Sequence, residues 1–122
     1  MIQTTNKDTV EINLKLPSLN EYTRVCRGNA IVASKFKRDI ELKISYFLVN
    51  MKKYEKPIFI NFNWIEKNKK RDLDNIAFAK KFILDAMVKT KKIKNDGWQY
   101  VAGFSDKFSL GKETKVVLEI FH

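Results

Sequence analysis

Two carboxylates, Asp72 and Asp74, stand one residue apart inside the strongly basic segment of residues 69–75. Proteins bind Mg²⁺ with one or two carboxylates, and waters and substrate phosphate oxygens complete the shell around the ion. A divalent ion bound in this way can deprotonate a water for attack on a phosphodiester and neutralise charge on the leaving oxygen. The pair therefore indicates a hard-cation site, and the neighbouring cations would hold the phosphodiester: Lys69, Lys70 and Arg71.

The same carboxylates also have a structural interpretation. Asp is a preferred residue at the start of a helix, where its charge is worth about 0.3–1 kcal/mol. A helix is expected directly after this segment, so Asp74 is predicted as its N-cap, whereas Asp72, in the loop, gains little from the helix. Capping explains one residue of the pair, and both interpretations stay open.

Asp96 is the candidate third carboxylate. It lies in Asn95-Asp96-Gly97, a combination that is also common in tight turns. His122 is the only histidine, so neither a histidine-based nucleophile nor an imidazole metal cluster can be built. The sequence also has no Gly-rich phosphate loop. Any catalysis would use carboxylates, lysines and a metal ion.

The charge of the chain favours a polyanionic partner. Its 122 residues include 24 Lys and Arg against 14 Asp and Glu, a formal net charge of +10. Nucleic acid, an anionic membrane surface or an acidic protein would match this charge, and the carboxylate pair favours nucleic acid. Lys91, Lys92 and Lys94 follow an expected helix, so they either complement its C-terminal dipole or contact DNA phosphates.

Cysteine usage and hydropathy suggest a cytoplasmic protein. Cys26 is solitary, so the chain can form no internal disulfide and no cysteine-based zinc cluster, and we interpret it as a small residue packed near a loop. No apolar stretch approaches the ~20 residues that cross a bilayer, and the polar first residues do not resemble a secretory signal. We expect one domain over residues 1–122, without a membrane partner.

Hydrophobic periodicity predicts the elements that position these residues. Alternation over 10–16 predicts a strand ended by Pro17, and three- and four-residue spacing predicts a helix over 34–52. A strand over 58–64, a helix over 74–89 and two strands over 98–104 and 116–120 follow. The order β-α-β-α-β-β predicts an α+β fold, a mixed sheet with two helices packed against it.

Several aromatic residues could stack on bases, but most fall at alternating strand positions. We therefore interpret them as core residues rather than as a base-stacking surface. They are Tyr54, Phe59, Trp64, Trp98, Tyr100 and Phe104.

The motifs together resemble those of the RusA-type Holliday junction resolvases. In that family a D-x-D-N motif precedes a helix that carries a lysine and L-D-A-L, and an acidic pair follows a short loop. Here the corresponding segments are residues 72–75, 80–87 and 95–97, and residues 17–20 resemble the N-terminal P-x-x-N of the family. The match covers roughly residues 17–107, with Asn95-Asp96 in place of the acidic pair and about one extra helical turn before Asp85.

The resemblance implies a small homodimeric endonuclease, common in prophages, that uses Mg²⁺ or Mn²⁺ to cut four-way DNA junctions. It implies that Asp72, Asp74 and Asp96 bind the metal, and that a helical lysine lies near the scissile phosphate. Residues expected to contact DNA are Asn20, Lys69, Lys70, Arg71, Lys80, Lys91, Lys92, Lys94 and Lys107.

Helical spacing favours Lys81 over Lys80 as the lysine of the site. At 100° per residue, Lys81 falls on one stripe with Asp74, Phe78 and Asp85, whereas Lys80 points elsewhere. The alternative is a surface pair of Lys81 with Asp85, worth ~0.2–0.5 kcal/mol. For the whole chain, the alternatives are a basic nucleic-acid-binding module without catalysis and a phosphodiesterase with another nucleic-acid substrate.

Overall fold

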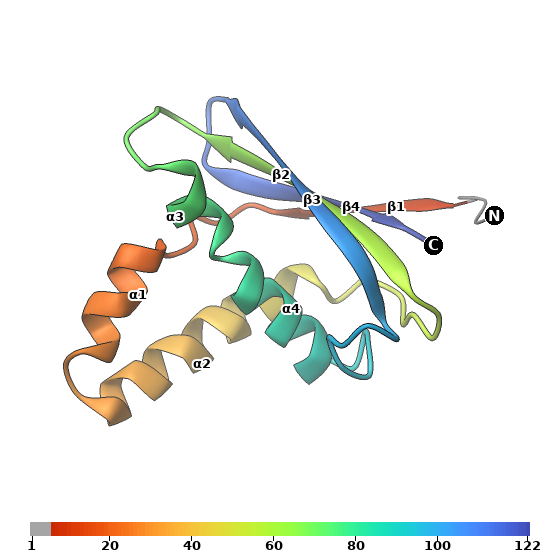
Figure 1. Cartoon of the computed structure of the whole chain (residues 1–122), viewed down its shortest axis with the longest axis horizontal. Coiled ribbons are helices and arrows are strands. Elements are labelled where there is room, and N and C mark those ends of the chain that lie inside the picture. The colour runs from red at the N-terminus through yellow and green to blue at the C-terminus, as the bar shows by residue number, and fades with distance from the viewer. Residues whose placement is uncertain (1–5) are drawn as a thin grey trace.

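The computed structural model describes residues 6–122, which form a four-stranded sheet with every helix on one of its faces (Figure 1). In chain order the elements are β1 (Lys7–Ile12), α1 (Leu19–Cys26), α2 (Ala30–Phe47), β2 (Ile58–Glu66), α3 (Leu73–Ala77), α4 (Lys80–Lys89), β3 (Val101–Leu110) and β4 (Lys115–Phe121).

The sheet is mixed, with the strand order β1-β4-β2-β3. β4 runs antiparallel to both β1 and β2, whereas β2 and β3 are parallel, with Glu66 opposite Leu110 at their carboxyl ends. The segment between the parallel strands contains α3 and α4 and crosses the helical face of the sheet (Figure 1). The expected α+β fold is confirmed.

The core lies between the sheet and the helices. Alternate residues of β2 and β4 point to the helices and are almost fully buried, as the alternation in the sequence requires. The helices contribute apolar residues that recur every three or four positions. The largest fully buried side chains include Phe62 and Leu118 from the sheet and Ile44, Phe82 and Met87 from the helices.

The N-terminal strand is shorter and earlier than predicted. β1 ends at Ile12, where the Leu14 N–H donates to the Ile12 carbonyl, 3.0 Å away, in a turn that takes the chain out of the sheet. Leu16 is nevertheless buried. The alternation over 10–16 therefore identified the buried side but not the end of the ladder.

The first helical region differs from the prediction in number and position. α1 was not predicted; it begins with a capping box in which the Glu21 N–H donates to Ser18 Oγ at 3.1 Å and the Glu21 carboxylate accepts from the Ser18 N–H. α2 begins at Ala30 because Asn29 Oδ1 accepts from Ile31 and Val32, and it ends at Phe47 rather than at residue 52.

The predicted helix over 74–89 is two helices. At the junction the Ala79 N–H donates to the Ile76 carbonyl and the Phe82 N–H to the Ala79 carbonyl, both three residues back, so the backbone tightens locally. Figure 1 shows the resulting bend between α3 and α4. The stripe of side chains expected along one straight helix therefore does not continue across the junction.

The last two strands are β3 and β4, and β3 begins later than predicted. Trp98 precedes β3 and is 95% exposed, so its interpretation as a core residue is wrong. Phe104 is 50% exposed on β3, which is an edge strand. The observed order is β-α-α-β-α-α-β-β rather than β-α-β-α-β-β.

The face of the sheet away from the helices carries a polar network centred on Glu119. The Glu119 carboxylate accepts hydrogen bonds from the side-chain amides of Asn61 at 2.7 Å and Asn63 at 3.1 Å, and Lys7 Nζ lies 3.1 Å away. The amide of Asn61, then Asn63 and Lys7, lower the pKa of Glu119 to about 2. The folded state therefore prefers the ionised carboxylate.

We expect this preference to make stability depend on acid. Because the pKa of Glu119 is lower in the folded chain than its ordinary value of 4.5, the stabilisation is present above pH 4.5 and is lost as the pH falls towards 2. Urea unfolding of Glu119→Gln should show lower stability near pH 6 and a smaller loss between about pH 5 and pH 3 than the unsubstituted chain. Parallel pH profiles for the two proteins would contradict this assignment.

Candidate active site

A groove of about 440 Å³ lies at the carboxyl ends of the parallel strands β2 and β3, where α3 begins. Ligand sites in sheets with parallel strands commonly occupy this position, because the loops that follow the strands meet there. The groove has a polar side and an apolar side. Its lining residues are Glu66, Asn68, Lys69, Arg71, Asp72, Leu73, Ile76, Phe108, Ser109 and Leu110.

Arg71 fixes the loop that leads from β2 to α3. Its Nε and Nη2 donate to the two carboxylate oxygens of Glu66 at 3.0 and 2.8 Å, and its Nη1 donates to the Leu16 carbonyl at 2.9 Å. Both side chains are largely buried. Arg71 is therefore engaged within the fold, whereas Lys69 and Lys70 are exposed and pair with no carboxylate in residues 6–122.

The two Asn-containing motifs meet at the same end of the molecule. The backbone N–H of Asn20, in the first turn of α1, donates to Asn75 Oδ1 at 3.0 Å. This hydrogen bond joins positions 55 residues apart in the sequence. The P-x-x-N and D-x-D-N segments thus form one surface, and Asn20 takes part through its backbone.

Asp72 and Asp74 both lie exposed at the start of α3, with their roles as caps reversed from the prediction. Asp72, not Asp74, occupies the N-cap position, and its side chain makes no capping hydrogen bond. Asp74 lies in the first turn, where Oδ1 accepts from the Asn75 N–H at 3.0 Å. Helix capping therefore does not account for the Asp72 carboxylate.

Within residues 6–122, the aspartates singled out in the sequence differ from the other aspartates in their lack of cationic partners. Most acidic side chains of this basic chain lie within 4.0 Å of a lysine, arginine or histidine nitrogen. Among residues 6–122, the acidic residues without an ion pair are Glu21, Asp72, Asp74, Asp96 and Glu113. Every aspartate that pairs with no base is thus one of the three candidates.

The structure does not bring Asp96 to the other two aspartates. Asp96 follows α4, whereas Asp72 and Asp74 lie at the start of α3, so the ten residues of α4 separate them by about 15 Å of helix rise. Ligands of one Mg²⁺ each lie about 2 Å from the ion. Accordingly, no group of three potential metal ligands of the His, Cys, Asp and Glu types occurs in the described part of the chain.

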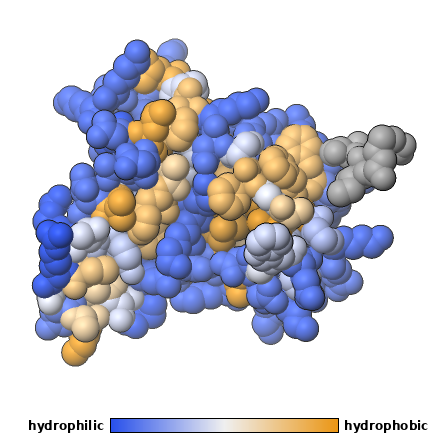
Figure 2. All heavy atoms as spheres, in the orientation of Figure 1, coloured by the Kyte–Doolittle hydropathy of each residue, from blue (hydrophilic) through white to orange (hydrophobic). Residues whose placement is uncertain are grey.

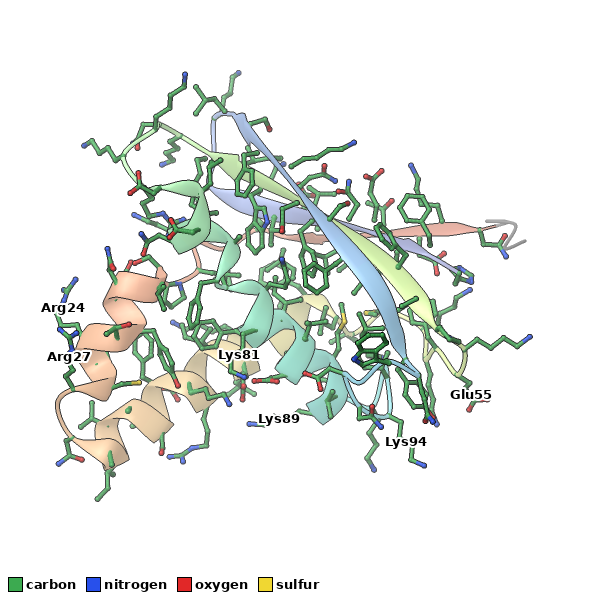
Figure 3. All side chains as sticks on the ribbon, in the orientation of Figure 1. Arg24, Arg27, Glu55, Lys81, Lys89 and Lys94 are labelled. Carbon is green, nitrogen blue, oxygen red and sulfur yellow. The ribbon has the colours of Figure 1, made fainter. Side chains whose placement is uncertain are left out.

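Lys80 and Lys81 point to different neighbours. Lys80 Nζ lies 2.7 Å from Asp106 Oδ2 of β3 and 3.9 Å from the centre of the Phe104 ring, with its side chain 14% exposed. Trp64 Nε1 donates to the same carboxylate at 2.8 Å. Lys81 is 56% exposed, and its Nζ lies 3.8 Å from Asp85 (Figure 3), so the surface pair is formed and the role of Lys81 beside a phosphate stays a prediction.

The remaining basic residues are spread over the surface. Lys91 and Lys94 are exposed beyond α4, but Lys92 turns inward, with its Nζ 3.5 Å from the Val49 carbonyl. Lys107 is exposed on the sheet face away from the helices, opposite Asn63. Sequence reasoning missed Asp106, whose partners Lys80 and Trp64 are 26 and 42 residues away. It also missed Glu66, whose pairing with Arg71, five residues on, depends on how the loop folds.

Comparison of the sequence with models of known protein families and with curated proteins finds no match. Within residues 6–122, no helix has both the length and the apolar character needed to span a membrane.

The start of α3 suits a hard cation in the kind of donor it offers. Within residues 6–122, Asp72 and Asp74 supply carboxylate oxygens that no lysine or arginine neutralises, and Mg²⁺ needs only one or two protein carboxylates because it retains waters. The residues that would hold a metal in one chain are therefore these two. Lys69, which lines the groove, and Lys70, exposed beside it in the sequence, precede these aspartates and could attract a phosphodiester.

Substitution of Lys80 and substitution of Lys81 should lower the free energy of unfolding by different amounts. Removal of Lys80 leaves the Asp106 carboxylate, 24% exposed, with only the Trp64 N–H, so Lys80→Ala should lower the free energy of unfolding by roughly 2 kcal/mol. Lys81→Ala should change it by less than about 0.5 kcal/mol. Chemical denaturation of both variants tests this, with Lys80→Met/Asp106→Leu as the compensated control. Equal losses for the single variants would show that the Lys80 pair contributes nothing beyond a surface contact.

Proposed function

We propose that this chain is a metal-dependent, structure-selective endodeoxyribonuclease that resolves four-way DNA junctions in recombination and repair, in the cytoplasm. The observation that carries the proposal is a set of three aspartates that form no ion pair with any residue the structure describes, in a chain of net charge +10. In such a chain an acidic side chain readily finds a basic partner, so carboxylates that stay free suit a metal ion. The choice of a four-way DNA junction as the substrate rests on the resemblance of the motifs to those of the RusA-type resolvases.

Asp72, which lines the groove, and Asp74, two residues further on in the first turn of α3, would hold Mg²⁺ or Mn²⁺. The ion, when bound, supplies an activated water and positive charge for phosphodiester hydrolysis. Lys69 and Lys70 attract the DNA backbone, and Arg71 holds the loop in place through Glu66. The apolar side of the groove, formed by Leu73, Phe108 and Leu110, limits water on that side.

Two copies would be required for resolution. A four-way junction has two-fold symmetry, and two nicks on opposing strands are needed, so a symmetric dimer with one site per copy fits the substrate. The arrangement within one chain leaves Asp96 outside the Asp72–Asp74 site. A metal ligand role for Asp96 therefore requires the partner copy to present it.

Loss of either carboxylate should abolish cleavage but not binding. We expect Asp72→Asn and Asp74→Asn to bind a labelled four-way junction at least as tightly as the unsubstituted chain, since a charge that repels phosphate is removed. Cleavage in Mg²⁺ should fall at least about a hundredfold, and calorimetry should show loss of Mn²⁺ binding. Asp39→Asn, on α2, is the matched control and should leave both unchanged. Near-normal cleavage by Asp72→Asn would remove the basis of the metal site.

Sedimentation tests the dimer directly. At micromolar concentration we expect a particle of about twice the 14.4 kDa chain mass. If Asp96 acts across the dimer, a mixture of Asp72→Asn and Asp96→Asn chains should regain cleavage. In a dimer with one chain of each kind, one of the two sites combines an intact Asp72 with an intact Asp96. A 14.4 kDa particle for the free chain, together with one bound chain per junction in the complex, would exclude the dimer.

A second candidate function is nucleic-acid binding without cleavage. The separation of Asp96 from Asp72 and Asp74 favours it, because the resemblance implies three metal-binding carboxylates and the described residues of one chain do not form such a group. The same assays distinguish the two functions. A binder would hold the junction with equal affinity with and without Mg²⁺ and would leave it intact.

A further inference from the structure

The segment after α4 holds a lysine in a backbone conformation that normally belongs to glycine. Lys91 has φ 61° and is the one non-glycine residue with positive φ within residues 6–122. Its N–H donates to the Val88 carbonyl at 3.0 Å and the Lys92 N–H donates to the Met87 carbonyl at 2.9 Å, the hydrogen bonds of a Schellman motif. In this conformation a side chain strains the backbone, whereas glycine would not, which indicates a role for the Lys91 side chain.

Lys91 lines a groove of about 700 Å³ at the amino ends of β2 and β3. Lys94 lines the same groove, and Figure 3 shows it at the end of the molecule beyond α4, close to Glu55 in that view. Neither Lys91 nor Lys94 pairs with a carboxylate in the described part of the chain. The other lining residues are Lys53, Tyr54, Glu55, Val88, Ile93 and Tyr100.

The loop beside this groove presents a bare indole ring. Trp98 is 95% exposed, in a turn whose Tyr100 and Val101 N–H groups donate to the Gly97 carbonyl at 3.0 and 2.9 Å. The backbone of the loop is thus ordered while the ring contacts solvent. Aromatic rings that lie open beside cationic side chains are the components of surfaces that bind unstacked nucleic-acid bases.

We propose that residues 91–98 form a second nucleic-acid contact, in which Lys91 and Lys94 bind backbone phosphates and Trp98 stacks on the exposed face of a base. This inference rests on the proposed function for the identity of the ligand, DNA with an open branch point. The contact lies at the other end of α4 from Asp72 and Asp74, about 15 Å of helix rise, or roughly four base pairs along a duplex. It would therefore bind DNA on one side of the cleaved bond.

Trp98 provides a direct signal for the stacking. The full chain is titrated with an uncleaved four-way junction in EDTA, and its tryptophan fluorescence is followed. Trp64 is buried and hydrogen-bonded to Asp106, so a change in fluorescence reports mainly on Trp98. We expect quenching that disappears in Trp98→Phe. Trp98→Ala should weaken binding about tenfold. Unchanged emission at saturation would overturn the stacking.

Substitutions of Lys91 distinguish the effect of its charge on DNA binding from the effect of its backbone strain on stability. Lys91→Gly should bind the junction about threefold to tenfold more weakly in low salt, yet its Tm should rise by roughly 2 °C because the strain is relieved. Lys91→Ala should lose the same affinity without a gain in Tm, and Lys91→Arg should retain the affinity. Lys43→Ala, an exposed lysine of α2, is the control for a general loss of charge.

The outcomes distinguish this contact from the proposed function. If the Lys91 and Trp98 variants bind normally while Asp72→Asn still loses cleavage, the second contact is wrong and the nuclease stands. If weakening at Lys91 merely equals that at Lys43, the groove is not a site. If the unsubstituted chain binds neither junction, duplex nor single strand, both proposals fail.

Discussion

The parallel pairing of β2 with β3 is the constraint on which the rest of the structure depends. Parallel neighbours cannot be joined by a hairpin, so the chain must return across the whole length of the sheet before β3 begins. α3 and α4 make this return, and their buried residues close the core over the sheet. The crossover also fixes where the polar loops lie: residues 67–72 at the carboxyl ends of the strands and residues 90–100 at the amino ends.

The Arg71–Glu66 pair makes the first of these loops a rigid one. A bidentate arginine–carboxylate contact with both side chains mostly buried is expensive to break, by about 3–5 kcal/mol, because the remaining charge would be left without a partner. Its third contact, to the Leu16 carbonyl, ties in the segment that precedes α1. Asp72, the next residue, is thereby held at the groove, and among the described residues it forms no ion pair.

On the face that carries β3, α3 and α4, hydrophobic residues collect in bands with polar residues between them (Figure 2).

Some charged residues of this strongly basic chain form ion pairs and others do not. The buried Glu41 is neutralised by Lys37 of its own helix and by Lys89 of α4. The carboxylates at the start of α3 and the lysines at positions 91 and 94 form no ion pair within residues 6–122. Local charges of both signs are thus left available at the two ends of the α3–α4 segment.

The sequence alone determined the fold class, the alternating strands and the candidate carboxylates, because these depend on the local order of residue types. It could not determine that helix 74–89 bends at Ala79, that Arg71 is occupied by Glu66 and Leu16, or that Lys80 faces Asp106. It also predicted Trp98 as a core residue, whereas the ring is exposed. The contacts of Arg71 with Leu16 and of Lys80 with Asp106 depend on which distant segment lies opposite the side chain, and only the packing of the crossover helices on the sheet decides that. For the same reason, the distance between Asp96 and the other two aspartates is a property of the tertiary structure.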